Sequence, residues 1–129
     1  MGLLKSLTRI DLYMNDLTGT IPSEIGLMTF LTHLDLDGNE LDLGYNAMTG
    51  TIPSEMWLLP SLTHLDLGYN ALTGAIPYEM GLLTSLQYLS LSGNHLSGTI
   101  PSEVGLLTSL TNLDLCKQHQ CCVLYLQVE

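Results

Sequence analysis

Two short segments of this 129-residue sequence place a histidine two residues before an aspartate: His33-Leu34-Asp35 and His64-Leu65-Asp66. In an extended strand, residues two positions apart face the same side, so each histidine would lie beside its aspartate. Imidazole nitrogens and carboxylate oxygens can bind a divalent metal ion if the two segments lie close together. The alternative is an ordinary solvated surface, because exposed carboxylates are screened by water.

Both segments belong to a repeat that runs through most of the chain. The pair Ile-Pro recurs with spacings of 31, 24 and 24 residues between successive copies. The four copies are Ile21-Pro22, Ile52-Pro53, Ile76-Pro77 and Ile100-Pro101. A single unit of this length cannot bury its own leucines, whereas units stacked side by side bury them in one continuous core. The repeat therefore predicts a solenoid.

The first half of a representative unit predicts a strand followed by a turn. Leu65 and Leu67 alternate with polar residues, which indicates a short strand with one buried face. Asn70 should then turn inward, where its amide can donate to and accept from the backbone of neighbouring coils. The pair Thr73-Gly74 predicts a turn, because glycine adopts backbone conformations that other residues resist.

The second half of the same unit predicts a helical turn. Pro77 fixes the φ angle at its entry. Met80, Leu83 and Leu86 then recur every three residues, which is typical of a 3₁₀-like segment that buries one stripe of side chains.

The frame Leu-x-x-Leu-x-Leu predicts five parallel strands on one face of the solenoid. Their expected centres are Ile10–Leu12, Leu34–Leu36, Leu65–Leu67, Leu89–Leu91 and Leu113–Leu115. The residues that flank each buried leucine should face outward in columns that cross the strands. One column is Arg9, His33, His64, Tyr88 and Asn112, and the next is Asp11, Asp35, Asp66, Ser90 and Asp114.

The recurring string Leu-Asp-Leu-x-x-Asn-x-Leu-Thr-Gly-x-Ile-Pro-x-Glu-x-Gly-x-Leu resembles the plant-type leucine-rich repeat, and the resemblance covers about residues 1–115. It implies an α/β leucine-rich-repeat solenoid: a right-handed horseshoe segment with a parallel concave sheet and a 3₁₀ or irregular convex side. This family forms the ectodomains of receptor-like kinases and secreted inhibitors of polygalacturonases, which degrade the cell wall. The resemblance does not identify a partner.

We therefore predict a non-catalytic module of a receptor-like or secreted recognition protein that binds a protein or peptide on its concave face. Tyrosine is common at binding hot spots, and the acidic columns favour a basic partner. Because aspartate in Leu-Asp-Leu is ordinary in this type of repeat, we predict no metal site and no cofactor. The residues expected to carry recognition are Arg9, Asp11, His33, Asp35, His64, Asp66, Tyr69, Tyr88 and Asp114.

Two alternative functions remain open. In the first, the chain is the repeat portion of a longer receptor-like kinase whose enzymatic domain lies elsewhere. In the second, it is a structural or surface-binding solenoid, because threonines form a regular ladder at Thr8, Thr32, Thr63 and Thr111. An extracellular or cell-surface location is expected only if the parent protein follows the family.

The charge of the chain argues against binding to nucleic acid. There are 13 acidic and 3 basic residues, for a net charge of −10, so a polyanion would be repelled. No stretch approaches the roughly 18 apolar residues that a membrane-spanning helix needs. We therefore predict neither a nucleic-acid partner nor a membrane-spanning segment within this chain.

Three parts of the chain depart from the repeat. The chain begins in the middle of a unit, because residues 1–7 align with residues 80–86, and we predict a fragment of a longer protein. Residues 34–47 contain a seven-residue insertion in which the Leu-Asp-Leu string occurs twice. Residues 116–129 are a non-consensus tail that could add one short strand. It holds Cys116, Cys121 and Cys122, whose spacing does not match a structural zinc site.

The insertion forces a choice between the two copies of the string. Both of its flanks keep the repeat frame, so one copy must loop out, and a loop that short adds little closure entropy. We predict that Leu34 and Leu36 occupy the strand and that part of residues 39–46 bulges from the rim.

The convex side carries a second irregularity. Trp57 replaces the glycine found at the equivalent place in other units. The next position of every unit is a leucine: Leu3, Leu27, Leu58, Leu82 and Leu106. The pattern favours additional packing between coils. A lateral contact surface is the alternative.

Overall fold

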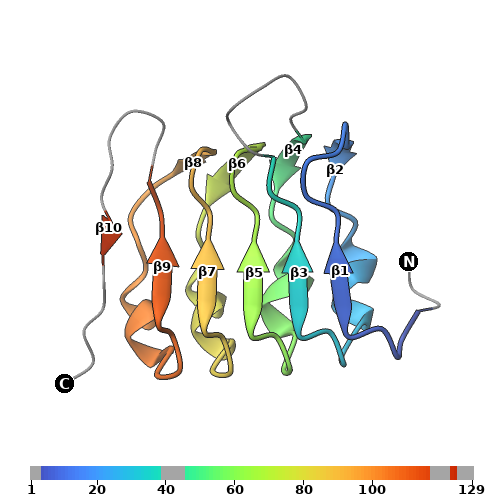
Figure 1. The fold of residues 1–129 in the computed structure, drawn as a ribbon. Helices are drawn as coiled ribbons and strands as arrows, with labels where there is room; N and C mark the ends of the chain where they lie inside the picture. The colour runs from blue at the N-terminus through green and yellow to red at the C-terminus, as the bar shows by residue number, and fades with distance from the viewer. Residues whose placement is uncertain (1–3, 39–45, 117–122, 125–129) are drawn as a thin grey trace.

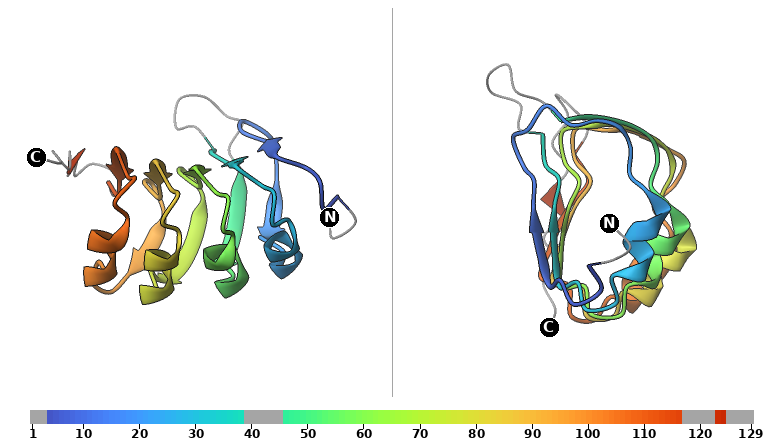
Figure 2. Two further views of the ribbon diagram at one scale, coloured as in Figure 1. Left: turned by 90° about the horizontal axis from the view of Figure 1, so that it is seen from below. Right: turned by 90° about the vertical axis from the view of Figure 1, so that its right-hand side faces the viewer.

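The chain forms a stack of similar coils, shown in Figure 1. The computed structural model describes residues 4–38, 46–116 and 123–124. Each complete coil contains a strand of a long sheet, a strand of a second sheet and a short 3₁₀ helix. Viewed along the stack, the coils superimpose as a closed loop with the long sheet on one side and the 3₁₀ helices on the other (Figure 2).

Among the residues that the structure describes, the long sheet has six strands in the order β1-β3-β5-β7-β9-β10, of which the first five are parallel. The five parallel strands are β1 (Arg9–Asp11), β3 (His33–Asp35), β5 (His64–Asp66), β7 (Tyr88–Ser90) and β9 (Asn112–Asp114). The predicted parallel face is therefore confirmed. Each strand lies one residue earlier than predicted, although hydrogen bonding continues beyond it: the N–H of Leu12 donates to the Asp35 carbonyl at 2.8 Å.

The sixth strand, β10 (Val123–Leu124), comes from the predicted tail and runs antiparallel to β9. In its register, Val123 pairs with Asp114 and Leu124 pairs with Leu113. Cys121, Cys122 and the last five residues lie outside the described part of the chain.

A second parallel sheet was not predicted from the sequence. Its strands, in the order β2-β4-β6-β8, are β2 (Thr18–Thr20), β4 (Ala47–Thr51), β6 (Ala71–Ala75) and β8 (His95–Ser97). The expectation of a simple turn at Thr73-Gly74 was therefore wrong. Gly74 does adopt a left-handed backbone, with φ of 89°, but stacking aligns equivalent segments so that their backbones pair.

In the described part of the chain, four 3₁₀ helices line the side opposite the long sheet: η1 (Ser23–Leu27), η2 (Ser54–Leu58), η3 (Tyr78–Leu82) and η4 (Ser102–Leu106). A proline precedes each one, with φ between −61° and −83°, and so prepares the chain for helical geometry. Each helix ends on a bond between residues three apart, such as the N–H of Met28 to the carbonyl of Ile25. The predicted 3₁₀ segments are confirmed.

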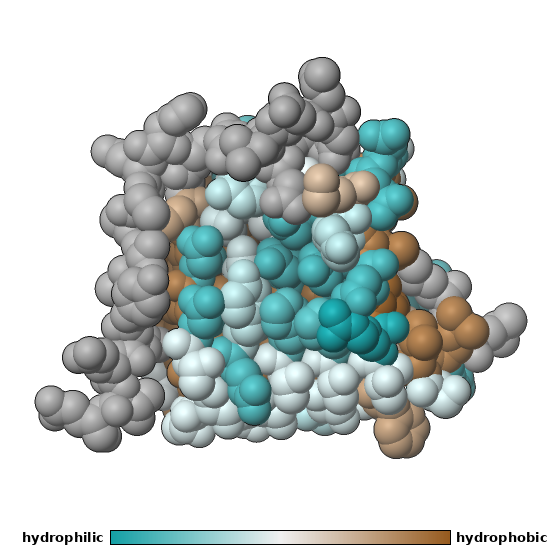
Figure 3. Space-filling view, viewed as in Figure 1, coloured by the Kyte–Doolittle hydropathy of each residue, from teal (hydrophilic) through white to brown (hydrophobic). Residues whose placement is uncertain are grey.

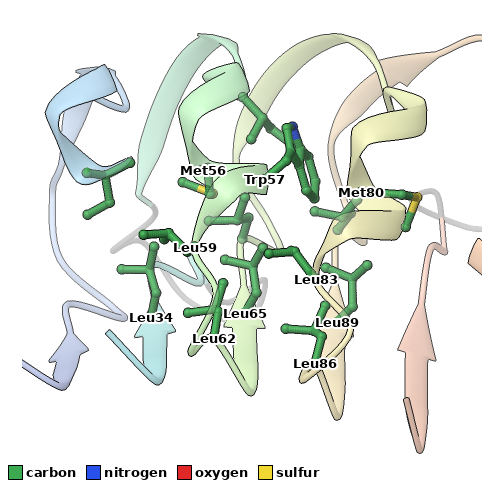
Figure 4. Packing of buried hydrophobic residues seen from close by; sticks show 14 of the residues in the cluster. Leu34, Met56, Trp57, Leu59, Leu62, Leu65, Met80, Leu83, Leu86 and Leu89 are labelled. Carbon is green, nitrogen blue, oxygen red and sulfur yellow. The ribbon is translucent and has the colours of Figure 1, made fainter. Parts of the chain in front are cut away.

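Leucines from the strands and from the segments around the 3₁₀ helices meet in one continuous core. Leu34, Leu65 and Leu89, at the centres of three adjacent strands, are completely buried. Figure 4 shows them facing Met56, Met80 and their neighbours across the coil interior. Stacking is what closes this core, because each coil contributes only a thin layer of side chains.

Buried asparagines connect the coils through their side-chain amides. The Nδ2 of Asn70 donates to the carbonyls of Leu36, Leu67 and Gly68 at 2.9 to 3.3 Å. Its Oδ1 accepts from the N–H of Met48 at 3.2 Å. Asn46 and Asn94 occupy the equivalent positions in the adjacent coils and bond in the same way. The inward-facing ladder predicted for Asn70 is confirmed.

The strand at the insertion uses the first copy of the repeated string, as predicted. His33–Asp35 forms β3 and pairs with both β1 and β5. The chain continues to Gly38, whose N–H donates to the Gly68 carbonyl, and it rejoins the repeat at the buried Asn46. Residues 39–45, where the bulge was expected, lie outside the described part of the chain.

The convex irregularity separates into two parts. Trp57 is completely buried and contributes to the core, so this residue does provide extra packing. Leu27, Leu58, Leu82 and Leu106 instead remain 53 to 60 % exposed, which corrects the expectation that they pack between coils. They extend from the short 3₁₀ turns, where a residue adjacent to the buried stripe points away from the core. Over the described residues, no helix has the length and apolarity to cross a membrane.

Candidate binding surface

The register of the long sheet brings the two predicted columns into place on its outward side. Arg9 pairs with His33, His33 with His64, His64 with Tyr88 and Tyr88 with Asn112. The second column, Asp11, Asp35, Asp66, Ser90 and Asp114, follows the same pairing two residues later. We call these two columns the sheet face. Figure 3 shows that mostly hydrophilic side chains cover this side of the molecule.

Three rings of the first column form a continuous stack across β3, β5 and β7. The rings of His33 and His64 are 4.0 Å apart between centroids, with an interplanar angle of 9°. The rings of His64 and Tyr88 follow at 4.3 Å and 8°. Neighbouring strands lie about 4.8 Å apart, which is close to the centroid separation of stacked rings, so rings at equal positions on adjacent strands can stack face to face. The stack makes a flat, rigid strip on an otherwise polar surface.

An ion-pair group lies at the β1 end of this stack. The Nε of Arg9 contacts Asp11 Oδ2 at 2.6 Å, and His33 Nε2 contacts Asp11 Oδ1 at 3.2 Å. Asp11 therefore connects the guanidinium to the first ring of the stack. Because Arg9 is largely exposed, this pair contributes little to folding stability and mainly fixes the orientation of the side chains.

At the other end, Tyr88 and Asp66 hold each other in place. The hydroxyl of Tyr88 donates to Asp66 Oδ2 at 3.1 Å, and the N–H of Gly68 donates to Asp66 Oδ1 at 2.9 Å. Burial raises the pKa of Asp66, although both of these hydrogen bonds oppose that rise. Burial and the neighbouring Asp66 carboxylate also raise the pKa of Tyr88. The Tyr88 phenol therefore stays protonated and keeps donating to the carboxylate.

His64 lies between two other rings and is partly withdrawn from water. Burial, and after it the neighbouring His33, lowers the pKa of His64, whereas Asp66 and Asp35 partly oppose this. A histidine whose pKa lies below 6.5 is predominantly neutral at pH 7, so it offers one ring nitrogen as an acceptor or metal ligand.

The aspartates of the second column bond to their own chain as well as facing outward. In β3 and β9, the carboxylates of Asp35 and Asp114 accept from the backbone N–H groups of Asp37 and Cys116, at 3.1 and 3.0 Å. The same bond joins Asp66 to the backbone two residues later. These carboxylates therefore shape the turn after each strand, which explains why aspartate recurs there independently of any partner.

Tyr69 differs from the other predicted site residues because it follows β5 rather than lying within a strand. Its backbone is left-handed, with φ of 46°, and its N–H donates to the Ser92 carbonyl at 2.8 Å. Its ring lies against Gly93 so closely that a Cβ on Gly93 would be 2.6 Å from the ring. Tyr69 is thus fixed by the next coil and lies beyond the C-terminal end of β5.

The threonine ladder has a role within the fold. The hydroxyls of Thr32 and Thr63 each donate to the backbone carbonyl of the preceding coil, at Thr8 and Thr32, both at 2.9 Å. Thr111 donates in the same way to Gln87 at 3.0 Å. Gln87 replaces threonine in this column and interrupts it. The ladder therefore connects neighbouring coils along the edge of the long sheet.

The sequence placed the columns correctly but missed two features of the site. It did not indicate that the rings of His33, His64 and Tyr88 stack, although rings at equal positions of adjacent parallel strands were a sufficient signal. The sequence also predicted that the aspartates are simply solvated. In the structure, the carboxylates of Asp66 and Asp114 also accept hydrogen bonds from the backbone N–H groups of Gly68 and Cys116, two residues later.

Comparison with protein families gives a consistent result. The family model described as "Leucine Rich Repeat" matches residues 6–28, 30–59 and 85–107, and a second model with this description matches residues 59–76. No curated protein sequence matches the chain.

Several solved structures share the fold. The ectodomain of the plant membrane receptor kinase GASSHO1/SCHENGEN3 from Arabidopsis thaliana, solved with CASPARIAN STRIP INTEGRITY FACTOR 2, is 39 % identical with a TM-score of 0.81. The match covers 89 % of this chain and 13 % of that one. The Arabidopsis receptor kinase HAESA, solved with the peptide hormone IDA and the co-receptor SERK1, is 37 % identical with a TM-score of 0.79. That match covers 89 % of this chain and 18 % of that one.

A plant ice-binding protein is also similar, at 33 % identity and a TM-score of 0.73, over 82 % of this chain and 32 % of that one. The chain therefore spans less than a third of the length of each of these three proteins.

Proposed function

Because the chain belongs to the leucine-rich-repeat family, we propose that its sheet face binds a peptide or protein ligand and performs no catalysis itself. The observation that supports this most directly is the rigid strip of His33, His64 and Tyr88, with charged groups along its edge. Flat aromatic area of this kind contacts a partner at low cost in side-chain entropy. The similar receptor ectodomains support the same proposal, because two of them were solved with a named factor or peptide hormone.

We assign this binding role to a receptor-like or secreted recognition protein, of which this chain supplies a few coils. Its length relative to the similar ectodomains fits a segment of a longer binding surface. A kinase domain elsewhere in such a protein would agree with the same proposal. The net charge of −10 and the acidic second column favour a basic segment in the ligand.

The test of the proposal is peptide selection against the chain. A random peptide library displayed on phage is panned against the immobilised protein, and the enriched peptides are synthesised and titrated. We expect Tyr88→Ala to weaken their binding at least about fivefold, which corresponds to about 1 kcal/mol of binding free energy. Binding should also weaken as salt rises, because charge attraction to the acidic face is screened.

The matched control is Tyr78→Ala. Tyr78 lies on η3, on the opposite side of the coil, and is 66 % exposed. The proposal fails if panning enriches no peptide, or if Tyr78→Ala reduces binding as much as Tyr88→Ala does. Charge reversal by Asp35→Lys tests the basic partner separately: unchanged affinity for the selected peptides would remove that part of the proposal alone.

A surface-binding role is the second candidate, and the similar ice-binding protein favours it. Ordered surfaces are bound by regular arrays of exposed side chains. The hydroxyls of Thr32 and Thr63 donate to backbone carbonyls within the fold, which argues against the threonine ladder as such an array. Microscopy of ice crystals grown in the presence of the chain distinguishes the two roles. Faceted crystals would favour surface binding over the peptide ligand.

A further inference from the structure

The two His-X-Asp segments of the sequence lie on adjacent strands, β3 and β5, and are in register. His33 pairs with His64, and Asp35 pairs with Asp66. All four side chains therefore project from the same side of the sheet. The repeat pattern alone favoured solvated carboxylates and predicted no metal site here. The structure adds a specific cluster, because one donor atom from each of His33, Asp35 and His64 lies within 4.8 Å of the other two.

This spacing is close to what a metal ion requires. In tetrahedral coordination with bonds of about 2.0–2.1 Å, two ligand nitrogens lie about 3.4 Å apart. The candidate ligand atoms lie within 4.8 Å of one another, so they must move closer together to share an ion. Because the rings of His33 and His64 are stacked and a nitrogen lone pair lies in the plane of its ring, both imidazoles must also turn their edges toward the ion. The backbone below them needs no change, because the N–H of Leu36 donates to the Asp66 carbonyl at 2.8 Å and keeps the strands in register.

The surrounding groups leave these three side chains as the ligand set. Both carboxylate oxygens of Asp66 already accept hydrogen bonds, from Tyr88 and Gly68. The hydrogen bond from the Asp37 N–H reaches Asp35 through Oδ1, so Oδ2 of Asp35 is the oxygen offered to the ion. The positive charge of Arg9 is balanced by its contact with Asp11. Asp11 also contacts a ring nitrogen of His33 at 3.2 Å, and such carboxylate–histidine contacts fix ring orientation at known types of metal site.

The chemistry of the three ligands also suits a transition-metal ion. The Asp35 carboxylate would supply negative charge to the ion. Two nitrogens and one oxygen match the preferences of late first-row divalent ions, whereas Mg²⁺ and Ca²⁺ prefer oxygen ligands throughout.

We propose that His33, Asp35 and His64 form a binding site for a divalent transition-metal ion of the Zn²⁺ class on the sheet face. Three protein ligands leave at least one coordination position open toward solvent. The open position faces the same side as the aromatic strip, so it is accessible to a ligand that contacts that strip. The site itself does not depend on the proposed peptide binding, because the ion is bound by this chain alone.

The test is a calorimetric titration of Zn²⁺ into the full 129-residue chain carrying Cys116→Ser, Cys121→Ser and Cys122→Ser, so that thiolates do not contribute. We expect one ion per chain. His64→Gln and Asp35→Asn should each weaken the binding at least about tenfold. The matched control His95→Gln should leave it unchanged, because His95 is exposed on the second sheet, in β8. Circular dichroism of each variant verifies the fold.

Three results would overturn the proposal: no Zn²⁺ binding, binding that His64→Gln and Asp35→Asn leave unchanged, or Mg²⁺ binding as tight as that of Zn²⁺. The last would indicate general attraction of cations to an acidic surface. If His64→Gln does not fold, Ni²⁺ is added to the chain that carries only the three cysteine-to-serine changes, and its imidazole proton signals are followed by NMR. His33 and His64 should broaden before His95. Broadening of His95 first, or of all histidines together, would contradict the site.

Discussion

The inward and outward sides of the same coils follow different rules. Inward, the coils repeat one another: Asn46, Asn70 and Asn94 make equivalent hydrogen bonds, and leucines occupy equivalent places in the core. Outward, the sheet face changes from coil to coil, with Arg9 on β1, histidines on β3 and β5, and Tyr88 on β7.

The difference reflects the physical constraints on each side of the coil. The inner positions must satisfy buried backbone groups in the same way at every step, so one residue type serves all coils. The outer positions are restrained only by the register, so they are available for a site specific to this chain. Substitutions on the two sides should therefore separate folding stability from binding.

The largest loss of stability is expected for Trp57→Ala. Trp57 is completely buried, and its removal leaves a large cavity between coils that should cost about 3–5 kcal/mol of the free energy of unfolding. Trp57→Phe should cost much less, because the indole N–H has no hydrogen-bond acceptor among the described residues, and phenylalanine carries no such donor. Urea denaturation measures both. Equal losses for the two variants would show that ring volume is not what matters.

A matched pair of asparagines tests the comparison between the two sides directly. Asn70→Ala removes three donated bonds and one accepted bond from a buried position, and should cost about 2–3 kcal/mol. Asn112→Ala removes the same side chain from an exposed position on β9, and should change stability by less than about 0.5 kcal/mol. Chemical denaturation of the two variants in parallel gives the ratio. Similar losses would remove the distinction between inner and outer positions.

The sequence predicted the features that repetition makes visible. The Leu-x-Leu frame located the five parallel strands, the proline after each isoleucine located the 3₁₀ helices, and Asn70 was correctly assigned to the interior. The choice of Leu34 over the second copy was correct, although the frame of the two flanks was compatible with either copy.

The features that were missed depend on contacts between coils. The second sheet arises when Gly50, Gly74 and their neighbours come alongside one another, and no single unit contains that information. The ring stack also requires three coils at once. The exposure of Leu58 next to the buried Trp57 depends on the direction of a short 3₁₀ turn, which spacing alone does not determine.

The smallest effect concerns the pH dependence of folding and comes from the outer side. The pKa of His64 in the folded chain lies below 6.5, its value when unfolded, because of burial and the neighbouring His33. The unfolded chain therefore binds more protons in the window below 6.5. The contribution of His64 to stability is present above pH 6.5 and is lost as the pH falls through its folded pKa. Asp66 acts at lower pH and in the opposite direction, because its pKa in the folded chain is raised above 3.8. Its contribution to folding stability is therefore lost as the pH rises through that pKa.

Between pH 7.5 and 5.5, the free energy of unfolding should therefore fall more for the unmodified chain than for His64→Gln. The difference should be well under the ~1.36 kcal/mol that corresponds to one full pKa unit, because the ring is partly exposed and solvent screens its charge. Urea denaturation at both pH values, with EDTA present so that bound metal does not contribute, measures this difference. His95→Gln, on the exposed surface of β8, should retain the full pH dependence of the unmodified chain. If His95→Gln rather than His64→Gln flattened the profile, the ring stack would not be the origin of the effect, and the outer side would influence folding only through its total charge.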